Sequence, residues 1–298
     1  MDNDKIKTFY EIANDHSEPP QPIIDDGILL DSSLLTIIGK HKSNKSFLAF
    51  NIGLAIASCK EFGGFKVIDK HRVLILSAEG GYYPNRERIQ RMVNNIAKED
   101  LKNILYSNKV IPDLGNEAED DMFNFCLEKY KPKVLILDPF IRFHTSDENS
   151  SSKMSIIFAK IRHIIESYGI AVILVHHTGK DTYRGGRGSS VIHGEYDSCI
   201  TIEKKKDKHL FKFDMRHVET PEPKELFFNP DTFWFEDPYK ISPLVQYIKT
   251  NGSSVMNDMV SHIIETQGCS KATAYRKIKA VVKDGIIVED GKKYKLSS

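Results

Sequence analysis

The fold of this chain is decided by one run of eight residues, Gly39-Lys40-His41-Lys42-Ser43-Asn44-Lys45-Ser46. An apolar run at 34–38 precedes it and a longer apolar run at 47–57 follows it, which is the pattern of a buried strand and a helix. A tight loop between strand and helix is the context that a phosphate-binding loop requires. In such a loop backbone N–H groups surround a phosphate, the Lys45 ammonium reaches the outer phosphates, and the Ser46 hydroxyl ligates Mg²⁺. We therefore predict that all eight residues bind a nucleotide.

One residue departs from the usual pattern of such a loop, because Asn44 stands where glycine is expected. Glycine serves there because the backbone approaches the phosphate closely and can need a positive φ. Asn is the other residue that tolerates the left-handed region best, at a cost of roughly 1 kcal/mol. We expect Asn44 to affect the rate of hydrolysis more than nucleotide binding.

Composition limits the class of protein. The 298 residues include 42 basic and 41 acidic side chains. The net charge is therefore close to zero and does not indicate a nucleic acid partner. The 4 cysteines form no CxxC pair, which indicates neither a zinc site nor a disulfide framework. No apolar run approaches the roughly 20 residues of a membrane-spanning helix, and the N-terminus is unlike a signal peptide. We expect a cytoplasmic protein without a membrane segment.

The chain divides into an N-terminal arm at 1–30, a domain at 31–236, a linker at 237–242 and a C-terminal domain at 243–298. In the large domain apolar strands alternate with helical periods, so we predict an α/β fold with a mostly parallel sheet and helices on both faces. The predicted strands are 34–38, 72–77, 104–106, 133–138, 170–175 and 197–203, with hairpin-like runs near 209–215 and 225–235. The predicted helices are 46–60, 84–97, 117–129 and 151–168, with a short one around Lys5 to Ala13 in the arm.

Two of the apolar strands end in carboxylates. In enzymes with a phosphate-binding loop a carboxylate at such a strand end supports Mg²⁺, so Asp138 is the natural partner of Ser46. By itself, Asp138 would equally suit the start of a turn. Glu79 follows the strand at 73–77, where it would lie over the crevice that binds ligands and could deprotonate an attacking water. The alternative for Glu79 is an ordinary surface turn.

Three further features lie downstream. His176 and His177 are adjacent on a strand and point to opposite faces, so we interpret one as a sensor of the γ-phosphate rather than both as metal ligands. The glycine-rich, basic residues 183–190 suit a loop around phosphates or a nucleic acid backbone, or a plain surface loop. Arg216 lies near the end of a strand with alternating apolar residues. It would either be an arginine finger that reaches the ATP of a neighbouring subunit, or pair with a surface carboxylate.

Taken in order, these motifs resemble the hexameric replicative helicases of the plasmid RepA type, a RecA-like, AAA_25-like branch of the P-loop ATPases. The resemblance covers roughly residues 30 to 220. Besides the phosphate-binding loop, it rests on Leu-Ser-Ala-Glu-Gly-Gly at 76–81, Leu-Asp-Pro-Phe-Ile-Arg-Phe-His at 137–144 with Asp147-Glu148-Asn149, Val-His-His-Thr-Gly-Lys at 175–180, and Arg-Gly-Ser-Ser at 187–190.

The resemblance implies a role for each motif. Lys45 and Ser46 would bind ATP and Mg²⁺, and Asp138 would be the second support of the Mg²⁺. Glu79 would be the catalytic base. His177 would sense the γ-phosphate, because it lies nearer the end of its strand than its neighbour.

The resemblance also implies an oligomer. It would be a ring, usually of six subunits, with ATP between subunits and DNA through the centre. Arg216 would act across the subunit interface. The loop at 147–153 and the loop at 184–190, with Arg184 and Arg187, would face the channel. We expect DNA and replication proteins among the partners.

The C-terminal domain has a different pattern. Short helices at 243–251 and 255–266 precede a third helix at 271–284, which Ser270 can cap, and a hairpin with an Asp-Gly turn follows at 286–296. This order resembles a winged helix-turn-helix domain, whose third helix would enter the major groove of DNA. The residues expected to contact DNA are Lys271, Thr273, Arg276 and Lys277 on the helix and Lys292 and Lys293 on the wing. The alternative is a winged helix that contacts another protein.

These features together predict an ATP-driven DNA motor, a replicative helicase of a plasmid or another mobile element that hydrolyses ATP at subunit interfaces. The alternative is a RecA-like module that binds DNA or regulates, with nucleotide as a switch and weak or no ATPase activity. Asn44 keeps this alternative open. Recombinase-like strand exchange is a third possibility.

Overall fold

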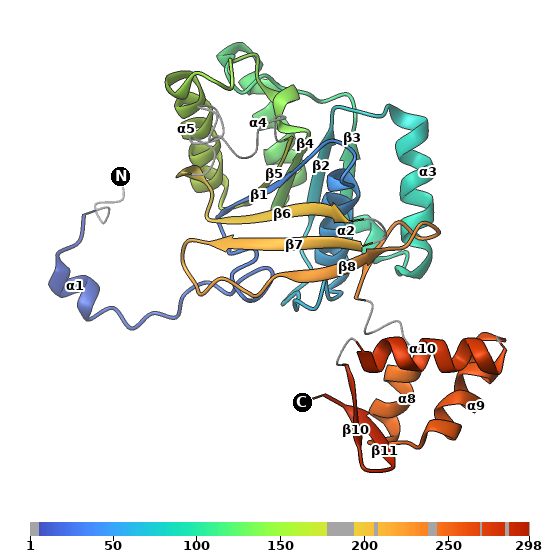
Figure 1. Ribbon diagram of the computed structural model, residues 1–298. Coiled ribbons are helices and arrows are strands. Elements are labelled where there is room, and N and C mark those ends of the chain that lie inside the picture. The colour runs from blue at the N-terminus through green and yellow to red at the C-terminus, as the bar shows by residue number, and fades with distance from the viewer. Residues whose placement is uncertain are drawn as a thin grey trace.

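The computed structural model describes residues 6–177, 194–205, 208–237, 243–268, 270–283 and 286–297. At its centre is a nine-stranded sheet with the spatial order β3-β2-β4-β5-β1-β6-β7-β8-β9 (Figure 1). The neighbours from β3 to β6 are parallel, and those from β6 to β9 are antiparallel. The strands are β1 Leu34–Gly39, β2 Val73–Ser77, β3 Ile104–Ser107, β4 Val134–Asp138, β5 Ala171–His177, β6 Ser198–Lys205, β7 Lys208–Met215, β8 Lys224–Phe228 and β9 Phe235–Glu236.

Helices cover both faces of this sheet (Figure 1). Alternate strand residues belong to two separate cores, because successive side chains of a strand point to opposite faces. Ile37 and Ile173 pack in the core that contains α2, whereas Leu137 and Leu174 pack in the core that contains α4 and α5. Among the described residues of this part, the long helices are α2 Lys45–Ser58, α3 Tyr82–Met92, α4 Asp120–Tyr130 and α5 Ser151–Tyr168. The predicted mostly parallel sheet with helices on both faces is therefore confirmed.

A buried asparagine fastens α2 to the antiparallel part of the sheet. The Nδ2 group of Asn51 donates to the carbonyl oxygen of Phe233 at 3.1 Å, and its Oδ1 accepts from the N–H of Phe235 at 2.8 Å. On the first turn of the same helix, Phe47 contacts the rings of Phe228 and Phe233. The helix that follows the predicted phosphate-binding loop is thus anchored to β8, to β9 and to the segment between these two strands.

Element boundaries differ from the predictions at several helices, most at α3 and α1. The helix expected at 84–97 runs over Tyr82–Met92, and a 3-10 turn at Val93–Asn95 replaces its last part. The helix expected from Lys5 runs over Phe9–Ala13 as α1, because Thr8 and Glu11 form a capping box that begins it there. Of the N-terminal arm, Ile24 and Leu29 are buried in the α2 core.

The C-terminal part has a core of its own. It consists of α8 Pro243–Asn251, α9 Met256–Gln267, α10 Lys271–Lys283 and the antiparallel pair β10 Ile287–Asp290 and β11 Lys293–Leu296. Buried side chains from each helix and from β10 meet in one cluster. Ser270 caps α10 as predicted, with its Oγ accepting from the N–H of Thr273 at 3.3 Å. No helix among the described residues is long and apolar enough to span a membrane.

Candidate functional site

The predicted phosphate-binding loop lies between the end of β1 and the start of α2. Lys42 and Asn44 both adopt left-handed backbone, with φ of 62° and 66°. Asn44 thus holds the conformation for which glycine is usual. At the other end of the loop, a Cβ on Gly39 would lie 2.7 Å from the carbonyl oxygen of Ile202, so this position has no room for a larger residue.

The two residues after Asn44 point into the site. The Lys45 ammonium donates to the carbonyl oxygens of Gly39 and Lys40, both at 2.7 Å. The Ser46 hydroxyl donates to Oδ1 of Asp138 at 3.1 Å. The structure therefore brings together the two oxygen ligands that the sequence assigned to Mg²⁺, although they are 92 residues apart. An oxygen-only donor set with a carboxylate suits this ion.

Burial makes the charges of this site costly. It lowers the pKa of Lys45 to about 8, against the opposing effects of Asp138 and Glu79. Burial also raises the pKa of Asp138 to about 6; Glu79 adds to the rise, while the hydrogen bond from Ser46 and the charge of Lys45 oppose it. A polyphosphate beside Lys45 and a divalent cation beside Asp138 would each supply an opposite charge, which favours the charged form of that side chain.

Glu79 lies just beyond the end of β2, at the same edge of the sheet. Its side chain is about half exposed, and its Oε1 is 3.6 Å from Nε of Arg142. The backbone turns sharply after it, with positive φ at Gly80 and Gly81. Glu79 and Arg142 line a cavity of about 500 Å³ with His41, Ile141, Glu148, His176 and His177. A water in this cavity would be within reach of the Glu79 carboxylate.

The two histidines that end β5 have different neighbours. The His177 ring stacks on His41 of the phosphate-binding loop, with centroids 4.6 Å apart. Burial, helped by the charges of Lys45 and His41, lowers the pKa of His177 to about 4, so the ring is neutral at pH 7. His176 instead lies with its Nδ1 3.6 Å from Oε1 of Glu148. His177 is therefore the histidine that faces the phosphate-binding loop.

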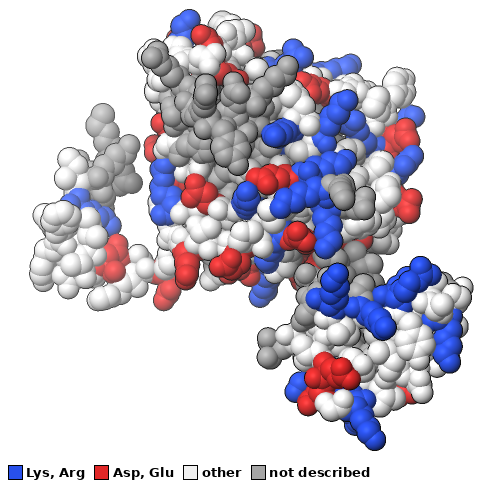
Figure 2. Space-filling view, viewed as in Figure 1, with Lys and Arg blue, Asp and Glu red and all other residues white. Residues whose placement is uncertain are grey.

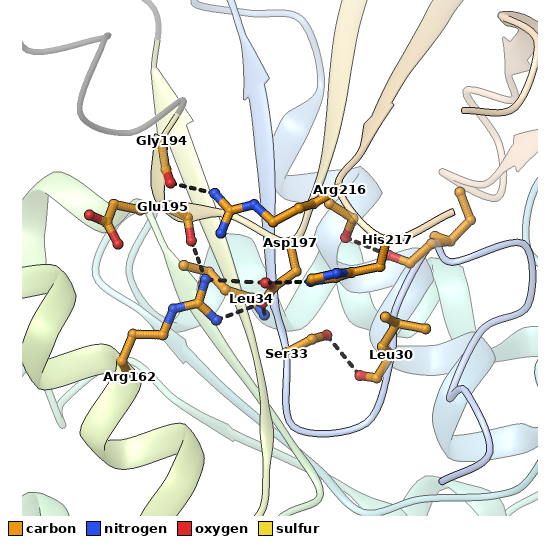
Figure 3. A network of polar contacts seen from close by, with 11 residues as sticks. Leu30, Ser33, Leu34, Arg162, Gly194, Glu195, Asp197, Arg216 and His217 are labelled. Atoms are coloured by element: carbon orange, nitrogen blue, oxygen red, sulfur yellow. Dashed lines mark hydrogen bonds and ion pairs between the residues drawn. The ribbon is translucent and has the colours of Figure 1, made fainter. Parts of the chain in front are cut away.

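Arg216 and the predicted phosphate-binding loop lie at opposite ends of the strands. β1 is paired with β6, and β6 with β7, so Met215 is level with Leu35 at the start of β1. The Arg216 guanidinium donates to the carbonyl oxygen of Gly194 (Figure 3). Among the described residues it makes no ion pair with a carboxylate. Arg216 is thus remote from the loop of its own chain.

The neighbouring Asp197 is the centre of a polar network (Figure 3). Its carboxylate accepts from Arg162 Nη1 at 2.6 Å and from the N–H of Leu34 at 2.8 Å, and it lies 3.2 Å from Nε2 of His217. Burial alone would raise the pKa of Asp197, but these hydrogen bonds hold it below its usual value. The network fixes the segment from which Arg216 projects.

The predicted DNA-contacting residues are only partly described. Arg184 and Arg187 lie outside the described residues. On the C-terminal part, Lys271, Arg276, Lys277, Lys292 and Lys293 are exposed. Thr273 is half-buried, and its hydroxyl accepts from Arg276 at 3.1 Å. Figure 2 shows basic side chains along α10. In the loop expected to face the DNA channel, Asp147 and Asn149 are exposed, but Glu148 turns inward to His176.

Several side chains around the site were not predicted. Arg142 and Glu148 belong to motifs that the sequence analysis quoted, but their place in the cavity beside Glu79 and His176, and the stacking of His41 on His177, became evident only in the fold. His209 also contacts the loop, with its Nε2 3.4 Å from Nδ2 of Asn44. A signal for His209 was available, because it alternates with Phe211 and two further apolar residues on the buried face of β7.

Known proteins support this fold. A solved structure described as the RadB recombinase is 15% identical, with a TM-score of 0.50, and the match covers 70% of this chain and 91% of that chain. A second, described as an ATPase domain, is 12% identical, with a TM-score of 0.54, and the match covers 77% of this chain and 95% of that chain. The likeness to both is one of fold, and the fold is RecA-like as the sequence predicted. The family model AAA_25, described as an AAA domain, matches residues 5–183, more than half of the 298 residues. The chain therefore belongs to the AAA_25 family of AAA domains, which here has the RecA-like fold of a P-loop ATPase.

Proposed function

We propose that this protein is an ATP-driven DNA motor, a replicative helicase of the plasmid RepA type that works as a ring, with six subunits the expected number. One observation carries the enzymatic part of the proposal. Ser46, Asp138, Glu79 and His177 come from four different elements and meet with Lys45 at one edge of the sheet. A chain that had lost hydrolysis would have no need to keep all of them together.

Each residue has a role in the proposed reaction. Lys45 and the backbone N–H groups of the loop bind the phosphates, and Mg²⁺ held at Ser46 and Asp138 neutralises their charge when bound. Glu79 is exposed enough to take the proton of the attacking water. The neutral His177 ring faces the γ-phosphate and responds to its loss.

The proposed assembly rests on Arg216. It lies at the far edge of the sheet, too remote to reach the nucleotide of its own subunit. Placed by the Asp197 network, it would reach the nucleotide of a neighbouring subunit. The winged helix-turn-helix domain that we propose for residues 243–298 would tether or select the DNA through α10 and the β10–β11 wing.

The decisive experiment measures ATP hydrolysis with and without single-stranded DNA. The parent protein should hydrolyse ATP faster with DNA, Lys45→Ala should lose nucleotide binding, and Glu79→Gln should bind nucleotide but not hydrolyse it. Glu87→Gln, which removes an exposed carboxylate on α3, is the matched control and should behave as the parent. Absence of turnover in the parent would reject the motor in favour of the nucleotide-switched module. Strand displacement must then be measured separately.

A further inference from the structure

The unusual asparagine of the phosphate-binding loop has a specific neighbour. Nδ2 of Asn44 is 3.4 Å from Nε2 of His209, although the two residues are 165 positions apart. His209 is the second residue of β7, and its side chain is on the face of the sheet that carries Phe211 and Met215. Only 2% of His209 is exposed. A loop residue that departs from the usual glycine is thus contacted by a buried polar side chain.

The protonation state of His209 sets the direction of this contact. Burial, with a smaller contribution from Lys204, lowers the pKa of His209 to about 4, so the ring is neutral at pH 7. A neutral imidazole has one donor and one acceptor nitrogen. The Asn44 amide N–H₂ can only donate, so Nε2 accepts and the ring proton is on Nδ1.

The ring is also held in place by its surroundings. Phe228 and Phe235 contact it edge to face, with centroid distances of 6.0 and 5.1 Å. Its Nδ1 is buried without a hydrogen-bond partner in the described part of the chain. The contact of Nε2 with Asn44 is therefore the hydrogen bond of this ring among the described residues, and the two aromatic neighbours leave the ring little freedom to turn away.

The backbone of Asn44 explains why its side chain needs a partner. With φ at 66° and ψ at 26°, Asn44 is in the left-handed region of backbone conformation. Residues other than glycine adopt this region at a cost in free energy. Asn44 makes no side-chain cap of α2, so its amide is not used within the helix. The hydrogen bond to β7 offsets the cost of the left-handed backbone and fixes the direction of the amide.

We propose that His209 is a positioning residue of the phosphate-binding loop, holding Asn44 so that the loop keeps the conformation that glycine provides in other such loops. The His209–Asn44 pair thus replaces the missing glycine. This inference rests on the proposed nucleotide binding. It also predicts that the requirement for His209 depends on the identity of residue 44.

A double-mutant cycle tests this dependence. The affinity for Mg²⁺–ADP is measured by calorimetry for the parent, His209→Leu, Asn44→Gly and the double variant. His209→Leu should weaken binding about threefold to tenfold, which is the range of one hydrogen bond. In the Asn44→Gly background the same substitution should change the affinity less than about twofold, because glycine needs no partner to hold a positive φ.

Two further variants separate positioning from packing. His209→Gln keeps an acceptor and should retain most of the parent affinity. Phe211→Leu alters the same face of β7 at a side chain that has no nitrogen to accept from the Asn44 amide, so its effect on affinity should be the same in the parent as in the Asn44→Gly background. Thermal denaturation without nucleotide verifies that each variant is folded before its affinity is compared.

The outcomes distinguish this proposal from the function on which it rests. If the parent binds nucleotide and His209→Leu weakens binding equally in both backgrounds, or in neither, His209 has no positioning role. If the parent binds no nucleotide, the proposed function fails and the positioning role fails with it. Weaker binding confined to the chain that has Asn44 supports the proposal.

Discussion

Replacing Asp138 with Asn should stabilise the nucleotide-free protein at neutral pH. Asn keeps an oxygen that accepts the hydrogen bond from the Ser46 hydroxyl, but it removes the negative charge of a residue that is only 3% exposed. Burial raises the pKa of Asp138 from 3.8 to about 6. At 1.36 kcal/mol per pKa unit, ionising this group in the folded state costs at most about 3 kcal/mol.

The pH dependence gives the prediction its sign. Because the folded pKa lies above the unfolded value of 3.8, the folded state binds more protons between 3.8 and about 6, and this group's contribution to stability is lost as the pH rises through that window. The cost is complete above about pH 6 and absent below pH 3.8. Asp138→Asn should therefore raise the melting temperature by roughly 6 °C at pH 7.5 and by less than about 2 °C at pH 4.5.

The assay is thermal denaturation of the nucleotide-free chain across this range of pH. Asp197→Asn is the control of opposite sign, because Arg162 and its other donors lower the pKa of Asp197, and that stability is present at neutral pH and lost as the pH falls. Asp197→Asn should thus lower the melting temperature at pH 7.5. Equal stabilisation by Asp138→Asn at both pH values, or destabilisation at pH 7.5, would refute the electrostatic reasoning. Addition of Mg²⁺ and ATPγS should stabilise the parent more than Asp138→Asn, because only the parent keeps the carboxylate for the ion.

Three further predictions concern the other elements. Arg216→Ala should reduce ATP turnover by a factor on the order of 10³–10⁵, and mixing it with Lys45→Ala should restore part of the activity if the arginine acts on a neighbour's site; no recovery in the mixture would contradict that geometry. Lys271→Ala should weaken DNA binding for all sequences and reduce the slope of log K against log salt by about 1, whereas Lys249→Ala, on α8, should leave both unchanged. Ser270→Ala should destabilise α10 by about 1 kcal/mol, observed as roughly fivefold faster hydrogen exchange of its amides in the full-length chain, and unchanged exchange would mean that the cap contributes nothing.

The strands and the Ser46–Asp138 pair could be predicted because they depend on local patterns. Each buried strand is an apolar run, and the ends of parallel strands meet at one edge of the sheet whatever the loops between them do. The turn of Glu148 toward His176 and the contact of His209 with Asn44 depend on how distant segments pack. The alternation of β7 places His209 on the buried face of that strand, but no pattern in the sequence indicates which residue it contacts there, and none indicates the direction of Glu148. The early end of α3 at Met92 was missed for a similar reason, since the carbonyl oxygen of Met92 accepts from the Trp234 indole, 142 residues away.

The separation of Arg216 from Gly39 across the sheet restricts the symmetry of any assembly that uses both. A contact in which the arginine of one copy meets the loop of the next joins two different surfaces, so it is heterologous. Such a contact does not by itself form a closed two-fold dimer. Repeated, it either closes into a ring or continues as a helical filament. The rotation between successive copies would then decide between the two forms, and a change at this interface could convert one form into the other without altering the fold of the subunit.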